Sequence, residues 1–246
     1  INLYSYVEDP FTDTAKFNWE KFRKHIGLAQ RIMDDVIDLE LEKVDAIIDK
    51  IVSDPEDREI KQVEISLWEN IKRNTVEGRR TGVGITAEGD MLAALGLRYG
   101  SENAIDFSVE VHKTIALEAY RSSVEMAKER GPFAVFDIKK EKDHPFINRL
   151  EKEDPKLIED MKKHGRRNIS LLTIAPTGTT SLMTQTTSGI EPVFLPIYKR
   201  RRKVNPNDKE VKVTFVDEIG DSWEEYNVFH QNFITWLKVN GMDPQE

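Results

Sequence analysis

Hydroxyl side chains and glycines gather in residues 170–194, which read SLLTIAPTGTTSLMTQTTSGIEPVF. An apolar run ends at Ala175-Pro176, and the five residues Thr177–Ser181 then hold one glycine and four hydroxyl side chains. The first amides of a helix have no intrahelical acceptor and carry the positive end of the helix dipole, so they favour an anion. Gly178 can adopt a positive φ and lets a ligand approach the backbone closely. A phosphate group is the ligand that this pattern favours.

Two other interpretations of this stretch bear on that hypothesis. A nucleoside-triphosphate P-loop requires a Lys after its last glycine, and Thr179 stands there instead. The Thr and Ser side chains can also serve only as caps of a helix that begins at a glycine turn. From the residues alone, the phosphate site and the simple helix cap are equally supported.

The elements around residues 170–194 must position this segment. The sequence predicts that these elements are strands alternating with helices. Strands that alternate with helices pair in parallel through crossover connections. In such folds, ligands bind beyond the carboxyl ends of the strands. The hydroxyl-rich stretch follows such an end. Strands are predicted at NLYSYV (2–7), TGVGI (81–85), FAVFD (133–137) and ISLLTIA (169–175).

Helices dominate the rest of the chain. Apolar spacing predicts helices over 18–37, 41–53, 57–74 and 101–130, and a short one that begins at Asp154-Pro155. Ser101 is the expected cap of the 101–130 helix. The buried face of the first helix is predicted to contain Trp19, Phe22, Ile26, Ala29, Ile32 or Met33, and Val36. That of the 101–130 helix is predicted to contain Ile105, Val109, His112, Ala116, Ala119 and Val124.

Composition narrows the class of protein. The chain has 246 residues, a net charge of −8 and no cysteine, so disulfides and thiolate metal sites are excluded. An acidic balance argues against a general nucleic-acid binder, and no apolar run reaches the ~18 residues of a membrane span. The amino end has no signal-peptide pattern and does not begin with Met, which suggests a fragment or a processed product.

The segment APTGTTSLMTQTTSGIEPVF closely resembles the phosphate-binding segment of ribonucleotide reductase catalytic chains, in the form typical of the adenosylcobalamin-dependent class II enzymes. RRTGVGITAEGDMLAALGLRYGSENA and HGRRNISLLTIAPTGT are similar to two further segments of that family. The resemblance runs from residue 1 to about 200 and is weakest over 41–75.

The resemblance implies a fold and a set of site residues. The fold is half of a ten-stranded α/β barrel, helix-rich and with parallel strands. Residues 1–246 would form one partial barrel domain, with about 199–222 as a surface excursion. Gly82 and Gly84 would lie on a barrel strand near the substrate or the cobalamin. The substrate's phosphates would bind Pro176, Thr177, Gly178, Thr179, Thr180 and Ser181, and the active-site wall would contain Ser188, Gly189, Ile190, Glu191 and Pro192.

The resemblance also implies what this chain does not contain. Family members reduce ribonucleotides with a thiyl radical and a cysteine pair, so the catalytic residues would lie outside these 246 residues, and the chain alone would be inactive. Its implied partners are the ribonucleotide substrate and the remaining part of the reductase chain, in the cytoplasm. Half a barrel exposes two sheet edges, so self-association is also expected. The alternatives are a non-catalytic module that binds a phosphate ligand and an unrelated α/β phosphotransferase.

Two charged clusters have a plainer interpretation. Asp34, Asp35 and Asp38 have the spacing of a magnesium–diphosphate site, but acidic triplets on a helix are usually a solvated face and no second such motif is present. The run Lys199–Lys203 (KRRRK) suggests nucleic-acid contact, but its surroundings are acidic. We therefore expect no metal and no nucleic acid at either cluster.

Overall fold

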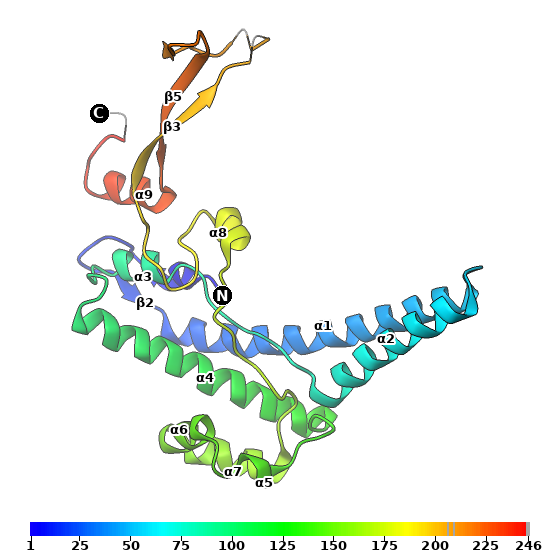
Figure 1. Cartoon of the computed structure of the whole chain (residues 1–246). Helices are drawn as coiled ribbons and strands as arrows, with labels where there is room; N and C mark the ends of the chain where they lie inside the picture. The colour runs from blue at the N-terminus through cyan, green and yellow to red at the C-terminus, as the bar shows by residue number, and fades with distance from the viewer. Residues whose placement is uncertain (206, 209, 245–246) are drawn as a thin grey trace. The chain divides into compact units, whose positions relative to one another are not determined.

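The computed structural model describes residues 1–205, 207–208 and 210–244, and its chain divides into two compact units (Figure 1). The first unit comprises Ile1, Asn18–Ile85 and Ile105–Ala175. The second comprises Asn2–Phe17, Thr86–Ala104 and Pro176–Glu246. Each unit is therefore assembled from segments that lie far apart in the sequence.

The first unit is helical. α1 packs against α2, and Figure 1 shows α4 running alongside α1. The Ser122 hydroxyl donates to the Gly27 carbonyl oxygen at 2.8 Å, so these two long helices approach closely where α1 has a glycine. The helices are α1 (Trp19–Ser53), α2 (Arg58–Gly78), α4 (Glu102–Arg130), α5 (Ile138–Glu141), α6 (Pro145–Glu153) and α7 (Pro155–His164).

Side-chain caps fix several helix starts. Asn18 Oδ1 accepts from the Lys21 amide at 2.9 Å at the start of α1. Ser101 Oγ accepts from the Ala104 amide at 3.3 Å, and Asp154 Oδ1 accepts from the Leu157 amide at 3.0 Å. The predicted caps at Ser101 and Asp154 are confirmed, because each side chain binds an amide that has no intrahelical acceptor.

The prediction of two helices over 18–37 and 41–53 is wrong, because α1 runs without interruption from Trp19 to Ser53. The residues between the predicted helices, Asp38–Glu40, include no Gly or Pro that would end a helix. α1 ends only before Asp54-Pro55, where the proline disfavours helical backbone at the residue that precedes it.

The buried face of α1 also differs from the prediction. Phe22 and Ile26 are buried as expected, but Ile32 and Val36 are exposed. The buried positions after Ile26 include the polar side chains of Gln30 and Asp34, neither of which belongs to the predicted apolar face. These positions are Gln30, Asp34, Ile37, Val44 and Ile51.

The α4 face is likewise rotated from the predicted one. Ala116, Ala119 and Val124 are buried as predicted, whereas Ile105 and Val109 are 54% and 60% exposed. Apolar spacing alone predicted the wrong buried face for the first two turns of α4, because apolar residues lie on more than one side of this helix. The buried set also contains Val111, Ile115, Tyr120 and Met126.

Two predicted strands, 81–85 and 169–175, form a parallel pair of extended segments. The Thr81 amide donates to the Ser170 carbonyl at 2.8 Å, and the Thr173 amide donates to the Val83 carbonyl at 3.0 Å. Only the bridge between Val83 and Leu172 meets the definition of β pairing. The parallel direction is confirmed, but neither segment forms a strand, and no closed barrel occurs among the described residues.

The other two predicted strands are wrong. Leu3–Tyr6 forms a 3-10 helix, η1, whose buried residues Leu3 and Tyr6 are three positions apart. Residues 133–137 form a turn in which the Phe136 amide donates to the Phe133 carbonyl at 3.0 Å. Short apolar alternation does not distinguish these structures from a strand.

The second unit contains η1, short helices and two antiparallel sheets. β1 pairs with β2, and the larger sheet has the order β3-β5-β4. β3 is exposed along its whole length, and all but its first two residues lie within the region of about 199–222 that we expected to be a polar surface excursion. Residues 206 and 209 of that region lie outside the described residues. The elements are β1 (Val7–Glu8), β2 (Lys16–Phe17), α3 (Glu88–Ala94), α8 (Gly178–Thr184), β3 (Ile197–Lys203), β4 (Phe215–Val216), β5 (Ser222–Phe229) and α9 (Gln231–Val239).

A buried polar network joins four parts of the first unit. Asn168 Nδ2 donates to Asp34 Oδ1 at 2.8 Å, and Asn168 Oδ1 accepts from Ser123 Oγ at 2.9 Å and from Gln30 Nε2 at 3.1 Å. Asp34 Oδ1 also accepts from Arg79 Nε at 2.8 Å. α1, α4 and the residues after α2 are thereby joined to the segment that leads into residues 169–175.

The pKa of Asp34 reflects this network. Burial alone would raise it, but hydrogen bonds from Arg79 and Asn168, together with the charges of Arg79 and Arg167, outweigh burial and hold the pKa below its ordinary value. The ionised carboxylate is therefore the form that stabilises the fold.

Among the described residues, none of the helices combines the length and the apolar character that a membrane span requires.

We expect Asp34→Asn to lower the free energy of unfolding at pH 7 by about 3 kcal/mol, because Arg79 then stays buried without its main counterion. Because the folded-state pKa is lowered, this stabilisation is present above the ordinary Asp pKa of about 4 and is lost as the pH falls through the folded value. Urea unfolding across this pH range measures both effects. The control is Asp49→Asn, an exposed position on the same helix; equal losses in the two variants would contradict the assignment.

Candidate functional site

The hydroxyl-rich segment forms a left-handed turn followed by the short helix α8. The left-handed residue is Thr177, with a φ of 51°, and not Gly178 as expected from the sequence. A β-branched residue in this conformation is strained, so the surrounding contacts must hold it there. A Cβ atom built on Gly178 would meet no atom within 4 Å. The glycine therefore leaves open space beside the start of α8.

The first amides of α8 are available to a ligand. No acceptor for the amides of Gly178, Thr179 and Thr180 occurs among the described residues, whereas the Ser181 amide donates to the Thr177 carbonyl at 2.8 Å. The side chains of Thr179 and Thr180 are exposed. Ser181 is buried, and its hydroxyl donates to the Gly178 carbonyl at 2.8 Å, so this hydroxyl is engaged within the turn.

The predicted wall segment contacts this turn directly. The Gly189 amide donates to Thr177 Oγ1 at 2.8 Å. Gly189 is buried and has a φ of 51°, whereas Ile190, Glu191 and Pro192 are exposed. The structure therefore brings one end of the predicted wall onto the predicted phosphate loop, and the hydrogen bond occupies the residue that bears the backbone strain.

The start of α3 holds the other side of the wall. The Ala87 amide donates to the Thr187 carbonyl at 2.9 Å, and the Glu88 amide donates to the Gly189 carbonyl at 3.3 Å. A Cβ atom on Gly89 would lie 2.6 Å from Pro192 Cα and 2.7 Å from the Glu191 carbonyl oxygen. Gly89 is thus required by the close approach of two backbones.

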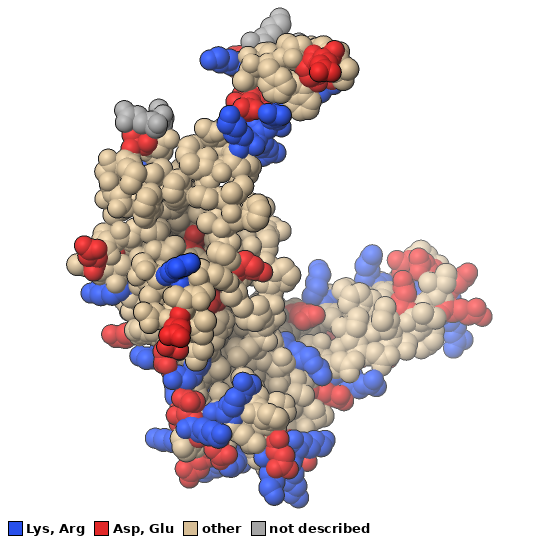
Figure 2. Space-filling view, turned by 60° about the vertical axis from the view of Figure 1, so that its left-hand side comes forward, with Lys and Arg blue, Asp and Glu red and all other residues tan. Residues whose placement is uncertain are grey.

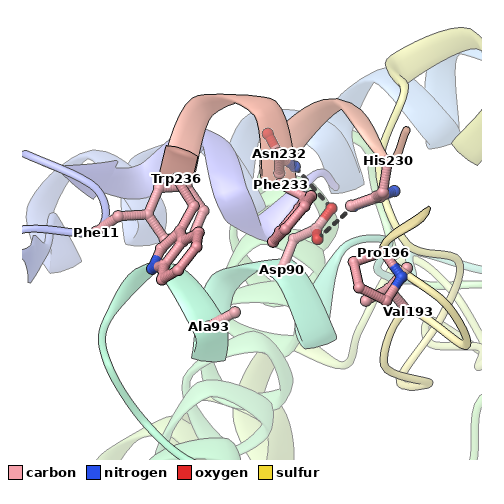
Figure 3. Close-up of a pocket in the computed structure, with 9 residues that line it drawn as sticks. All are labelled: Phe11, Asp90, Ala93, Val193, Pro196, His230, Asn232, Phe233 and Trp236. Atoms are coloured by element: carbon pink, nitrogen blue, oxygen red, sulfur yellow. Dashed lines mark hydrogen bonds and ion pairs between the residues drawn. The ribbon is translucent and has the colours of Figure 1, made fainter. Parts of the chain in front are cut away.

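A buried carboxylate lies beside this contact. Asp90 accepts hydrogen bonds from the Thr187 amide, from Asn232 Nδ2 and from His230 Nε2. Figure 3 shows His230 and Asn232 pointing toward Asp90 from the start of α9. Burial raises the pKa of the Tyr4 hydroxyl, and the negative charge of Asp90 raises it further.

The chain matches the family described as the ribonucleotide reductase barrel domain over residues 1–240. The chain belongs to this family. It is 29% identical over 200 residues to a vitamin B12-dependent ribonucleoside-diphosphate reductase of Mycobacterium tuberculosis, which covers 81% of this chain and 22% of that protein. The protein of the same name from Thermoplasma acidophilum is 30% identical over 200 residues, covering 81% and 20%.

A third relative carries no cofactor in its name. The ribonucleoside-diphosphate reductase subunit alpha of Chlamydia pneumoniae is 27% identical over 217 residues, which cover 80% of this chain and 18% of that protein. The chain thus spans about a fifth of the length of these reductases.

Two of the residues predicted for the reductase site lie in the first unit. A Cβ atom on Gly84 would lie 2.5 Å from the Thr173 carbonyl oxygen, and one on Gly82 would lie 3.1 Å from Thr173 Cγ2. Close packing of the two parallel segments therefore explains both glycines. Their contact with substrate or cofactor stays a prediction.

The two charged clusters are paired with residues of opposite sign. Guanidinium groups surround the aspartates of α1: Arg79 Nη1 lies 2.8 Å from Asp38 Oδ1 and Arg130 Nη1 lies 2.7 Å from Asp35 Oδ1. β3 faces acidic residues of β5, with Arg201 Nε 2.8 Å from Glu225 Oε2. Figure 2 shows side chains of both charges next to each other there.

Sequence reasoning missed several residues that shape the site. Their signal was weak, because each is an ordinary polar or small residue, and the contacts that engage them are long-range. Two unpaired atoms also mark this region: Asn2 Oδ1 and Thr86 Oγ1 are buried without a hydrogen-bond partner among the described residues. The missed residues are Gly89, Asp90, Thr187, His230 and Asn232.

We expect Gly89→Ala to displace the wall segment, because the new methyl group would overlap Pro192 and the Glu191 carbonyl, neither of which is a flexible side-chain end. Amide hydrogen exchange of a peptide that spans residues 187–192 should become faster. The control is Gly27→Ala on α1, where the nearest atom, Ser122 Cβ, is 4.0 Å away and alanine favours the helix. Unchanged exchange in the Gly89 variant would contradict the close approach.

Proposed function

We propose that this chain is the part of an adenosylcobalamin-dependent ribonucleotide reductase that binds the phosphates of the substrate. The complete enzyme would reduce ribonucleotides to deoxyribonucleotides in the cytoplasm. Family membership supports the general activity. The phosphate-binding residues in this proposal are Pro176, Thr177, Gly178, Thr179, Thr180 and Ser181, and the adjacent wall consists of Ser188, Gly189, Ile190, Glu191 and Pro192.

The observation that carries the proposal is the hydrogen bond from the Gly189 amide to Thr177 Oγ1. It joins the two sequence segments that the family resemblance assigns to one active site. It also leaves the amides of Gly178, Thr179 and Thr180 without an acceptor among the described residues. Backbone amides at the start of a helix bind phosphate oxygens through charge-assisted hydrogen bonds.

The proposal also names a cofactor, adenosylcobalamin, for the complete enzyme. Two relatives are named as vitamin B12-dependent, and this supports a cobalamin in the complete enzyme. Close packing against Thr173 accounts for Gly82 and Gly84, so their geometry does not by itself call for a cofactor. We therefore assign no described residue to cobalamin and derive no step of the reaction through it.

The chemistry at the ribose would come from other parts of the reductase. The chain has no cysteine, and reductases of this family act through a thiyl radical and a cysteine pair. What these 246 residues contribute is binding: amide donors for the phosphates and a wall that fixes the loop beside them. The chain by itself should yield no deoxyribonucleotide.

The principal alternative is a non-catalytic module that binds a phosphate ligand with the same loop. Both functions use the amides of α8, so phosphate binding does not distinguish them. The distinction lies in whether the complete protein, supplied with cobalamin and a dithiol, forms deoxyribonucleotide.

We expect Gly178→Val to weaken substrate binding by the complete enzyme at least about tenfold, since each charge-assisted hydrogen bond contributes about 1.5–3 kcal/mol. A Cβ atom at this position would meet no atom of the described residues within 4 Å, so the chain has open space there and the variant tests the approach of a ligand. Isothermal titration with ribonucleotide measures the affinity. Thr184→Val introduces the same residue at an exposed position of α8 outside the proposed loop and should bind normally. Full affinity in the Gly178 variant would refute the phosphate assignment.

We also propose that the remaining part of the reductase covers apolar side chains that this chain exposes. Leu182, Met183 and Phe194 are 79%, 82% and 92% exposed, unusually high values for large apolar residues. Ile174, at the end of an extended segment that has one hydrogen-bonded neighbour, is also exposed.

Without that covering, the 246-residue chain should self-associate and bind a dye that reports exposed apolar surface. Size-exclusion chromatography with light scattering measures the mass over a range of concentrations. Adding the remaining part of the reductase should suppress both signals. A dye-negative monomer at every concentration would argue against the half-barrel architecture.

A further inference from the structure

Asp90 is a buried carboxylate whose two oxygens are both occupied. It is 3% exposed. Oδ2 accepts from the Thr187 amide at 2.9 Å and from Asn232 Nδ2 at 2.7 Å. Oδ1 lies 2.7 Å from His230 Nε2. A carboxylate that accepts from three groups has little capacity left for a substrate, so a role in proton transfer is not what this geometry favours.

The contact with Thr187 is reciprocal. The Asp90 amide donates to Thr187 Oγ1 at 3.2 Å, while the Asp90 carboxylate accepts from the Thr187 amide. With the bond from the Ala87 amide to the Thr187 carbonyl, the first turn of α3 engages every polar group of Thr187. Thr187 is therefore fixed in position and orientation.

Thr187 lies two residues before Gly189, whose amide donates to Thr177 Oγ1. A continuous series of hydrogen bonds and backbone thus runs from His230 and Asn232 through Asp90 and the wall to the strained residue of the phosphate loop. Backbone strain of this kind persists only where neighbouring contacts impose it.

Apolar side chains shield this carboxylate. A cavity of about 250 Å³ beside Asp90 is lined mostly by apolar groups (Figure 3). Phe233 and Trp236 of α9 stack with ring centroids 5.5 Å apart. Low polarity strengthens the hydrogen bonds to the carboxylate and raises the cost of removing a partner. The apolar lining is Phe11, Ala93, Val193, Pro196, Phe233 and Trp236.

We propose that Asp90 is a positioning residue for substrate binding: it fixes the wall at Thr187–Gly189 and couples the phosphate loop to residues 230–232. This inference rests on the proposed function of the loop. It assigns to the start of α9, which no sequence motif marked, a part in shaping the active site. Asp90 acts through Thr187 and Gly189 and does not touch the substrate.

The test compares Asp90→Ala, Asp90→Asn and Asp34→Asn in the complete reductase. Asp90→Ala should raise KM for the ribonucleotide about tenfold and change kcat less than about threefold, because misplaced phosphate donors weaken ground-state and transition-state binding alike. Hydrogen exchange at residues 187–189 should become faster. Asp90→Asn should restore most of the affinity, because its side-chain oxygen can still accept from the Thr187 amide and from Asn232, the two contacts that join the wall to α9.

Asp34→Asn is the matched control, since Asp34 is also a buried carboxylate with several donors but lies in the other unit. It should lower the melting temperature and leave KM unchanged. An equal rise of KM in this variant would show that the Asp90 effect is general destabilisation, and would overturn the proposal. Should Asp90→Ala not fold, Asn232→Ala removes one donor only and should raise KM about threefold, the loss of part of one hydrogen bond.

Gly178→Val, measured in parallel, separates this inference from the function on which it rests. If Gly178→Val leaves substrate affinity intact, the phosphate assignment itself fails. If Gly178→Val weakens binding while folded Asp90→Ala or Asn232→Ala keeps the normal KM, only the role of Asp90 is refuted.

Discussion

The buried contact between Asn168 and Asp34 is the interaction on which the first unit depends. Asn168 uses its side-chain amide to join α1, α4 and the residues after α2, and Asp34 holds Arg79 from the same position. A buried charge or amide that loses its partner costs more than the hydrogen bond itself contributes. The network therefore admits few other arrangements of these helices, and it fixes Asn168, the residue before the extended segment 169–175.

The second unit uses a buried carboxylate in a similar way. Asp90 gathers one backbone amide and two side chains from segments up to 142 positions apart in the sequence. Other contacts depend on two backbones that pack closely at a glycine. The backbone of Glu191 and Pro192 packs against Gly89, and in the first unit the Thr173 carbonyl oxygen packs against Gly84. Close packing explains the glycine at these two positions, whereas a search for sequence motifs would attribute both glycines to ligand binding.

The long helical segments could be predicted from the sequence with the caps at Ser101 and Asp154, since capping and periodicity are local properties, although the predicted break after residue 37 does not occur. The face that each helix buries could not be predicted in the same way. Gln30 and Asp34 are buried in place of Ile32 and Val36, because a satisfied polar network supplies partners that a hydrophobicity pattern does not represent. Parallel pairing was predicted for the strands in general, and 81–85 runs parallel to 169–175, but each segment has too few hydrogen-bonded neighbours here to form a strand.

The sequence by itself determined the family, the phosphate-loop hypothesis and the proximity of the loop to the wall, because these rest on a contiguous and specific run of residues. Only the tertiary structure decided that Thr177 and not Gly178 takes the left-handed conformation, since the bond from Gly189 holds it there. It alone identified Asp90, because its partners Thr187 and Asn232 are brought together by folding and not by spacing along the chain. A short contiguous segment is enough to indicate a phosphate loop, whereas the hydrogen bonds that a buried carboxylate accepts come from residues far apart in the sequence.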